Sequence, residues 1–182
     1  MKKFRQPSLA FIIILFFLGT LASLPALWPT EYIRVIRVSD GDTIKLANGE
    51  KVRLTGIDTP ESFASEKLNR DAQRSGQDKA TIQKMGKIAA EFTRTLVLNK
   101  DVRLEYDVTL KDRYGRTLAY VFLKDGTFVN AEIIKQGFAV PLTIPPNVKY
   151  AEVFKRLYQE SRAAHRGLWQ EEKVLTTEDM SE

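Results

Sequence analysis

Three aspartates in turn-rich positions are the first residues whose types and spacing suggest chemistry. Asp40 and Asp42 flank Gly41 where two extended segments meet, and Asp58 ends another extended segment sixteen residues after Asp42. If a meander brings Asp42 and Asp58 to one end of a sheet, their carboxylates, backbone carbonyls and water form a hard-oxygen site suited to Ca²⁺ or Mg²⁺. Asp-Gly is equally ordinary turn chemistry, so each aspartate alone is compatible with a structural role.

Two arginines and a glutamate form a second group of candidates. A guanidinium can hold an anion through two parallel hydrogen bonds, and a carboxylate beside water can accept a proton. Arg53 lies in an alternating extended segment, Arg116 lies in a Tyr-Gly-Arg turn, and Glu61 follows a proline. Taken one at a time, these positions favour solvated surface side chains. A functional interpretation therefore depends on whether the fold brings them together.

Composition excludes several other chemistries. The 182 residues contain no cysteine, which rules out cysteine zinc sites, thiol nucleophiles and disulfides. His165 is the only histidine, and its place late in an amphipathic segment favours a structural surface role. Lys2, Lys3 and Arg5 account for three of the 28 basic residues, which leaves 25 against 23 acidic ones. So mild a positive charge does not by itself identify a partner.

Residues 1–28 predict export or membrane anchoring. Three basic residues precede the apolar run 9–18, which continues more weakly to Trp28. This pattern is typical of a secretory signal, and Thr20 and Ala22 offer a weak cleavage motif. About twenty residues up to Trp28 also suffice to span a bilayer, so cleavage and retention as an anchor both stay open. Because the positive charge precedes the apolar run, we expect a secreted, periplasmic or membrane-anchored protein whose body lies outside the cytoplasm.

Five short strands are expected after residue 31. The segments 32–38, 43–46 and 51–57 are closely linked and form a meander. Asn48-Gly49, between the last two, is typical of a type I′ hairpin turn, which needs positive φ at both central residues. Two further alternating segments, 102–106 and 118–123, supply the fourth and fifth strands.

Three helices are expected around these strands. Residues 84–98 carry an apolar stripe at helical spacing. A short helix at about 129–136 ends at Gly137, the residue type expected just beyond a helix C-terminus. A last amphipathic helix begins near Tyr150. Residues 62–83 are polar and charged, which predicts a loop or a marginal helix.

These elements predict an α+β fold that is mainly a β barrel. Five strands with a helix between the third and fourth match a five-stranded Greek-key OB-fold barrel with three helices, preceded here by an N-terminal hydrophobic helix. We expect this domain to cover residues 31–169 and an acidic, flexible tail to cover residues 170–182. Fold class alone does not give function.

Three segments taken together resemble the signature of a known family. They are Asp40-Gly-Asp-Thr43, Arg53-Leu-Thr-Gly-Ile-Asp-Thr-Pro-Glu61 and Asp112-Arg-Tyr-Gly-Arg-Thr-Leu-Ala-Tyr120. In residues and order they are similar to the thermonuclease family, the staphylococcal-nuclease-like domains. The resemblance extends from about Tyr32 to Trp169. It implies an OB barrel with three helices, in agreement with the pattern of strands and helices.

The resemblance implies a calcium site. Asp42 and Asp58 fall on the family's calcium-binding carboxylates. Thr59 falls on a ligand that contributes its backbone carbonyl, and Asp40 falls on a group that orients water behind the ligands. The implied cofactor is Ca²⁺.

The resemblance also implies the groups that act on the substrate. Arg53 and Arg116 fall on the two arginines that clamp the phosphate, and Glu61 falls on the general base or positioner of the attacking water. Arg113 and Tyr114 match contacts to a terminal phosphate of the bound nucleotide. The implied reaction is hydrolysis of phosphodiesters in DNA and RNA. Guanidiniums stabilise charge that develops on the phosphoryl oxygens while a carboxylate takes a proton from water.

Two segments depart from the family pattern. The stretch 138–145 lacks the tyrosines that flank the bound base, so affinity or base preference can differ. The connection 62–83 is longer than in compact members. Its basic residues lie either in a solvated loop or against a nucleic-acid backbone; they are Lys67, Arg70, Arg74 and Lys79.

Three functions stay open at this level. The first is a nuclease that acts on DNA or RNA, and the presence of both arginines together with the acidic residues favours it. The second is a non-catalytic nucleic-acid or protein-binding module. The third is an envelope protein whose nuclease fold serves another pathway. The expected partners are nucleic acid and, if the first segment is retained, the membrane; no obligate protein partner is implied.

Overall fold

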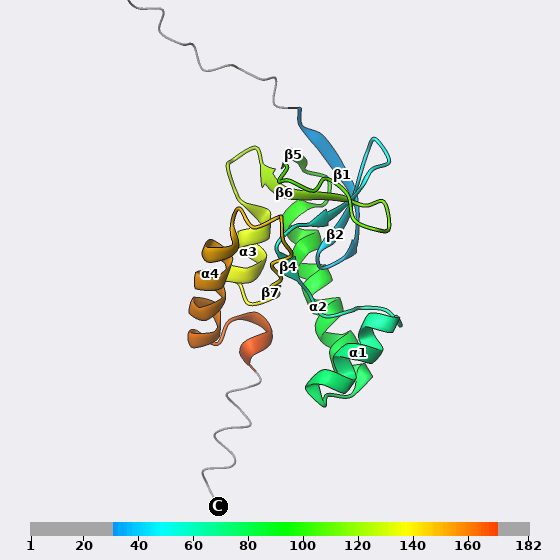
Figure 1. The fold of residues 1–182 in the computed structure, drawn as a ribbon, viewed down its shortest axis with the longest axis vertical. Helices are drawn as coiled ribbons and strands as arrows, with labels where there is room; N and C mark the ends of the chain where they lie inside the picture. The colour runs from blue at the N-terminus through cyan, green and yellow to red at the C-terminus, as the bar shows by residue number, and fades with distance from the viewer. Residues whose placement is uncertain (1–30, 171–182) are drawn as a thin grey trace, which may run out of the picture. The chain divides into compact units, whose positions relative to one another are not determined.

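The computed structural model describes residues 31–170 (Figure 1). The predicted signal or anchor segment, with its hydrophobic helix, and residues 171–182 of the acidic tail lie outside the described residues. Among the helices at residues 31–170, none combines the length and apolar character that a bilayer span requires.

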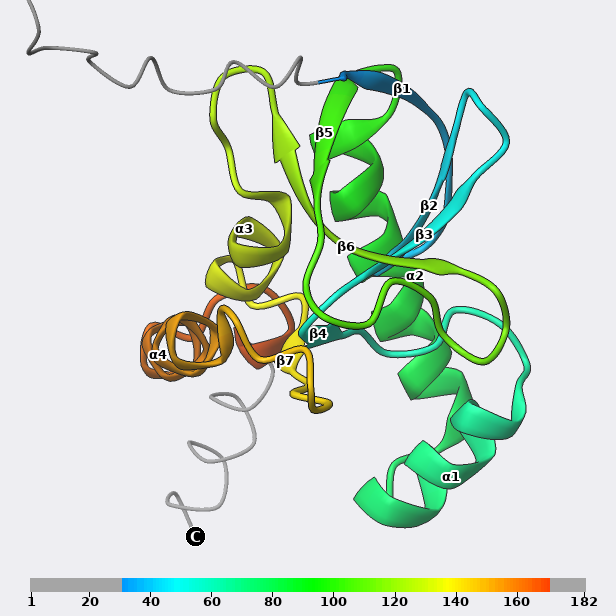
Figure 2. The ribbon, with the colours of Figure 1, turned by 45° about the horizontal axis from the view of Figure 1, so that its top comes forward.

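Five strands close into a barrel, which confirms the predicted fold. They are β1 (Ile33–Asp40), β2 (Thr43–Leu46), β3 (Lys51–Leu54), β5 (Asp101–Glu105) and β6 (Thr117–Leu123), in the order β1-β2-β3-β6-β5 around the barrel. The first three form the expected antiparallel meander. β5 is antiparallel to both β6 and β1, whereas β3 and β6 are parallel. This parallel pair joins segments far apart in sequence and closes the barrel (Figure 2).

The turn between β2 and β3 differs from the prediction. The hairpin is present, and Gly49 has a φ of 87°. Among described residues other than glycine, however, only Asn99 and His165 have positive φ, so Asn48 does not. The amide of Leu46 donates to the backbone oxygen of Glu50 at 2.9 Å. The prediction of a two-residue type I′ turn is therefore wrong, because the connection is longer and needs one left-handed residue.

The three expected helices are present, and the described residues contain a fourth. The expected helices are α2 (Lys79–Val97), α3 (Val129–Lys135) and α4 (Ala151–Ala163). The additional helix, α1 (Glu66–Ser75), occupies the segment where the sequence predicts a loop or a marginal helix. The Ser65 hydroxyl caps it by accepting from the Leu68 amide at 3.0 Å, and Gly76 ends it with a φ of 73°. Figures 1 and 2 show α1 beside the first half of α2.

The core fills the barrel and the space beneath the helices. Side chains such as Val35, Ile44, Val52, Val102 and Val121 are completely buried. α2 packs against β1, and α3 lies between β6 and α4. This burial of apolar surface supplies the main stabilisation of the domain.

A few polar and glycine contacts fix the helices to the barrel. Asn130 is completely buried, accepts from the Val121 amide and donates to the Thr55 carbonyl, each at 2.9 Å. At the far end, Gly137 packs against the backbone of the 3₁₀ turn that begins at Gly167; a Cβ on Gly137 would lie 2.1 Å from the Arg166 oxygen. A small two-stranded sheet pairs β4 (Ile57–Asp58) with β7 (Val140–Pro141), and so fixes the backbone at the predicted site residue Asp58.

Candidate active site

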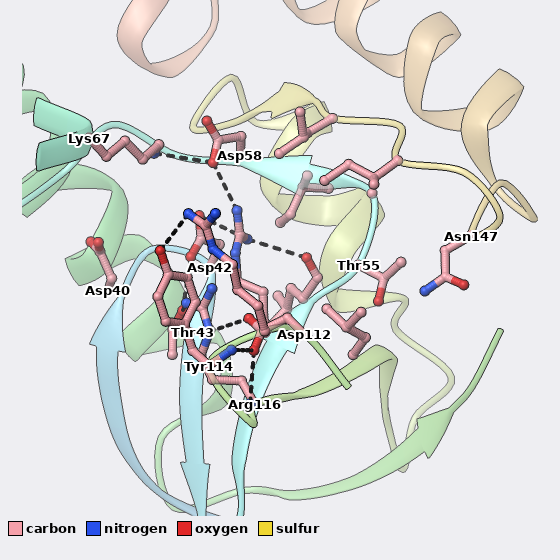
Figure 3. Close-up of a pocket in the computed structure, with 18 of the residues that line it drawn as sticks. Asp40, Asp42, Thr43, Thr55, Asp58, Lys67, Asp112, Tyr114, Arg116 and Asn147 are labelled. Atoms are coloured by element: carbon pink, nitrogen blue, oxygen red, sulfur yellow. Dashed lines mark hydrogen bonds and ion pairs between the residues drawn. The ribbon is translucent and has the colours of Figure 1, made fainter. Parts of the chain in front are cut away.

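A cleft of about 1070 Å³ gathers the predicted site residues (Figure 3). Its lining comes from β1 to β4, the first half of α1, the segment before β6 and the segment after β7. Thr59 is 2 % exposed and lies behind the lining. The predicted residues that line the cleft are Asp40, Asp42, Arg53, Asp58, Glu61, Arg113, Tyr114 and Arg116.

Strand register places Arg53 beside Asp42. Thr43 pairs with Arg53 across β2 and β3, and the Leu54 amide donates to the backbone oxygen of Asp42 at 2.9 Å. Asp42 is 5 % exposed, and its Oδ2 accepts from the amide and the hydroxyl of Thr59 at 3.1 and 3.0 Å. The same oxygen lies 2.9 Å from Arg53 NH1. Asp42 is thereby held in one orientation at the floor of the cleft.

Arg53 links Asp42 to the second predicted carboxylate. Its NH2 donates to Asp58 Oδ1 at 2.8 Å, and its side chain is only 12 % exposed. Asp58 stays in place because it pairs with Val140 in the small sheet. Burial raises the pKa of Asp58 and outweighs the opposing effects of Lys67 and Arg53. Two neighbouring carboxylates thus share one guanidinium in a largely dry setting.

Glu61 is held by the first turn of α1 and by α2. Its Oε2 accepts from the Ser65 hydroxyl at 3.1 Å, and its Oε1 lies 3.1 Å from Lys67 Nζ. Its backbone packs on Gly86 of α2, where a Cβ would lie 2.4 Å from the Glu61 carbonyl carbon. The position of Glu61 therefore depends on both helices.

Arg116 reaches the cleft from the turn before β6, the strand that pairs with β3. Its Nε donates to Asp112 Oδ2 at 2.7 Å and its NH1 donates to the Thr43 hydroxyl at 3.4 Å. Asp112 also accepts the backbone amides of Tyr114 and Arg116, so this one carboxylate organises the whole turn. Burial raises the pKa of Asp112, but the hydrogen bonds from Arg116 and from these amides lower it below its usual value. The Thr43 hydroxyl in turn donates to Asp42 Oδ1 at 3.0 Å.

The predicted nucleotide contacts lie at the exposed rim. Tyr114 is 69 % exposed, and its hydroxyl accepts from Arg113 NH2 at 2.6 Å. The guanidinium carbons of Arg113 and Arg116 lie 4.7 and 5.6 Å from the centre of the Tyr114 ring. Phe63, which is 65 % exposed, also lines the cleft. His165 is exposed beyond the end of α4 and is not among the lining residues.

Asp40 lines the same cleft as Asp42. Its Oδ1 accepts from the Gly41 amide and from the Ser62 hydroxyl, each at 2.9 Å. Burial, together with the charge of Asp42, raises the pKa of Asp40 to about 6.

Lys67 lines the cleft, although the sequence predicts for it a solvated loop or a contact with a nucleic-acid backbone rather than a place among the catalytic and metal-binding residues. Its Nζ contacts the Thr59 carbonyl, Asp58 and Glu61 (Figure 3 shows the contact with Asp58). Burial lowers the pKa of Lys67, but Asp58, Glu61 and Asp42 together raise it above the usual lysine value. A helix start at Ser65 and a stop at Gly76 are readable in the sequence and could have placed this lysine in a first helical turn.

The donor atoms suit a hard cation. No group of three or more Asp, Glu, His or Cys side chains at residues 31–170 is arranged to hold a metal. An alternative set of metal ligands would be the carboxylates of Asp42 and Asp58, the Thr59 carbonyl and water. Asp58 Oδ1 and the Thr59 oxygen already converge on a positive charge, that of Lys67, at 3.1 and 2.8 Å. Carboxylate and carbonyl oxygens of this kind are the ligands that Ca²⁺ prefers.

Comparison with known proteins gives a consistent result. The family model described as Staphylococcal nuclease homologue matches residues 51–171. The chain is 40 % identical over 143 residues to the thermonuclease of Staphylococcus intermedius, which covers 77 % of each protein. It is 37 % identical over 139 residues to the thermonuclease of Staphylococcus hyicus, covering 75 % of this chain and 74 % of that protein. Endonuclease YncB of Bacillus subtilis is 35 % identical over 145 residues, covering 77 % of this chain and 62 % of that protein.

Proposed function

The chain belongs to the family of staphylococcal nuclease homologues and is a nuclease, and from this premise we propose a calcium-dependent hydrolysis of DNA and RNA phosphodiesters. In this reaction a water molecule attacks phosphorus in line with the leaving oxygen. No covalent enzyme intermediate is needed.

One observation carries the proposal: a continuous chain of polar contacts joins the two arginines to the acidic groups. Arg116 reaches Asp42 through the Thr43 hydroxyl, with steps of 3.4 and 3.0 Å. Arg53 then joins Asp42 to Asp58 with contacts of 2.9 and 2.8 Å. Unrelated surface residues would not converge on one cleft in this way.

The two arginines supply the electrostatic stabilisation. A guanidinium has five N–H donors in a fixed plane, so it can grip two phosphoryl oxygens at once. Arg53 lies on β3 and Arg116 precedes the neighbouring strand β6, and each is oriented by an aspartate. The charge on the phosphoryl oxygens grows in the transition state, and donors fixed in advance stabilise that charge without reorganising.

Glu61 is the group placed to accept the proton. Its carboxylate lies in the same cleft as both arginines, and Ser65 fixes one of its oxygens. As a water molecule attacks phosphorus, its proton passes to Glu61 while the bond to the leaving oxygen breaks.

Asp42, Asp58 and the backbone carbonyl of Thr59 would hold the calcium ion, with Asp40 behind them. When bound, the ion would neutralise charge on a nonbridging phosphoryl oxygen and acidify nearby water. Arg53 contacts both Asp42 and Asp58 and so keeps these two carboxylates close together.

We also propose that the enzyme acts outside the cytoplasm, secreted, periplasmic or anchored to the membrane. The support is the basic and apolar pattern of residues 1–28. Fractionation of cells that express the full chain tests this proposal: recovery of the protein in the cytosol alone would contradict it.

The proposed reaction is tested with the protein purified after expression of the full chain. Single-stranded DNA and RNA are incubated with it in calcium or in chelator, alongside Glu61→Gln and a control, Glu152→Gln, which alters a carboxylate of α4. We expect cleavage only with calcium, and a loss of about 10²–10⁴-fold in kcat for Glu61→Gln alone. Cleavage that persists in chelator, or a fully active Glu61→Gln variant, would refute the mechanism.

A further inference from the structure

Lys67 lies among the oxygen atoms that the proposed function assigns to the cation. Its ammonium nitrogen is 2.8 Å from the backbone oxygen of Thr59, 3.1 Å from Asp58 Oδ1 and 3.1 Å from Glu61 Oε1. In Figure 3 the side chain extends toward Asp58 from the side of the cleft opposite Asn147. The ammonium group thus donates to oxygen atoms of three residues, and in this respect it resembles a bound metal ion.

Helix α1 holds this ammonium in place. Lys67 belongs to the first helical turn, directly after the Ser65 cap and Glu66. The next residue, Leu68, is 3 % exposed and is the buried residue of α1. Because burial of Leu68 fixes the rotation of the helix, Lys67 must point into the cleft. One turn later, Asp71 Oδ2 lies 3.9 Å from the same nitrogen.

We propose that Lys67 is a tethered competitor of the divalent cation and so determines how tightly the active site binds calcium. This inference rests on the proposed function, in which the Asp58 carboxylate and the Thr59 carbonyl that Lys67 contacts would hold the calcium ion. Calcium binds oxygens at about 2.3–2.6 Å, so the two charges cannot share these atoms without strong repulsion. The lysine side chain must leave when calcium binds.

The same side chain couples cation binding to the general base. Both carboxylate oxygens of Glu61 are engaged by the first turn of α1, Oε1 by Lys67 and Oε2 by Ser65. Departure of Lys67 frees Oε1 to accept a hydrogen bond from water, while Ser65 still holds Oε2. Calcium binding would therefore free Glu61 Oε1 to act as the base, whereas without calcium this oxygen stays paired with Lys67.

Calorimetric titration of calcium into the purified protein, without nucleic acid, tests the proposal directly. Lys67→Gln removes the charge and keeps a hydrogen-bond donor. Arg74→Gln removes a positive charge from the exposed last turn of the same helix and serves as the matched control. We expect calcium to bind Lys67→Gln about tenfold or more tightly than wild type, as is typical of two coupled ligands. Arg74→Gln should bind as wild type does.

A chemical rescue separates charge from structure. The sequence has no cysteine, so Lys67→Cys carries a single thiol. Alkylation with 2-bromoethylamine forms a carbon–sulfur bond, releases bromide and restores an ammonium at lysine length. We expect tight calcium binding before alkylation and wild-type affinity after it. A merely structural role of residue 67 would not give this reversal.

Each outcome decides between the proposals. Equal calcium affinities for wild type, Lys67→Gln and both forms of Lys67→Cys would overturn the role of Lys67 and leave calcium-dependent cleavage intact. Cleavage by wild type in chelator, with no calcium binding, would overturn both. Tighter binding by Lys67→Gln without cleavage by any variant would sustain the competition and refute the nuclease mechanism.

Discussion

Gly86→Ala tests how closely helix α2 positions the proposed base. Gly86 is buried on the face of α2 that packs on the segment after β4. A Cβ there would lie 2.4 Å from the Glu61 carbonyl carbon, 2.5 Å from its oxygen and 2.6 Å from the Ser62 nitrogen. All three are backbone atoms, so no side-chain rotation can relieve the overlap.

The size of the displacement follows from these distances. Ordinary contact begins at 3.4 Å, so the Glu61 backbone must retreat by about 1 Å. Alanine favours the helix by about 1 kcal/mol relative to glycine, whereas overpacking costs about 1–3 kcal/mol. Net stability should therefore change little or fall slightly. A displacement of about 1 Å at a catalytic group costs on the order of 10²-fold in rate.

The assay is single-turnover cleavage of fluorescent single-stranded DNA in saturating calcium, together with a thermal melt. We expect the single-turnover rate constant of Gly86→Ala to fall about 10²-fold while the protein stays folded. The control is Gly49→Ala, where φ is +87° and no atom lies within 4 Å of the new Cβ. It should lose about 1–2 kcal/mol of stability from strain and keep full activity.

The result that would refute the reasoning is specific. If Gly86→Ala folds and cleaves within about threefold of wild type, the position of Glu61 does not limit the chemistry. If Gly49→Ala loses as much activity as Gly86→Ala, then stability rather than geometry controls the rate.

Three further predictions concern other parts of the molecule. Arg116→Lys keeps the charge but loses the planar fork, so kcat should fall about 10²–10³-fold with little change in KM, and equal activity would exclude a bidentate role. Phe63→Ala removes an exposed ring from the cleft wall and should raise KM for single-stranded DNA roughly fivefold, by loss of stacking; Phe63→Tyr should not, and an unchanged KM for Phe63→Ala would contradict stacking. Asp101→Asn removes a carboxylate whose pKa is lowered to about 2 by hydrogen bonds from Arg34 and Lys124. The depressed pKa means that its stabilisation is present above about pH 4 and is lost as pH falls through about 2. The melting temperatures of wild type and Asp101→Asn should differ at pH 7 and converge near pH 2, and a pH-independent difference would contradict the assignment.

Local sequence patterns account for much of the fold and for the identity of the candidate site. Some features depend only on neighbouring residues and can be predicted from the sequence. They are the alternation at 33–38 and 102–105, the Asn-Gly hairpin and the glycine after α3. The predicted carboxylates and arginines follow from the type and order of residues in three short segments. The fine geometry of the β2–β3 turn does not follow from local sequence, because loop length also depends on how the flanking strands pair.

Tertiary structure alone decides which of these residues meet. The parallel pairing of β3 with β6 places Arg53 opposite Leu118, two residues from Arg116, and no local pattern encodes a contact across so much chain. The partly buried position of Lys67 is also a tertiary effect. Helix α1 has Leu68 as its buried residue, so it lacks the apolar stripe from which a helix is recognised in sequence. Its stability comes from two caps and from contact with α2, and only that contact turns an apparently solvated lysine toward the carboxylates.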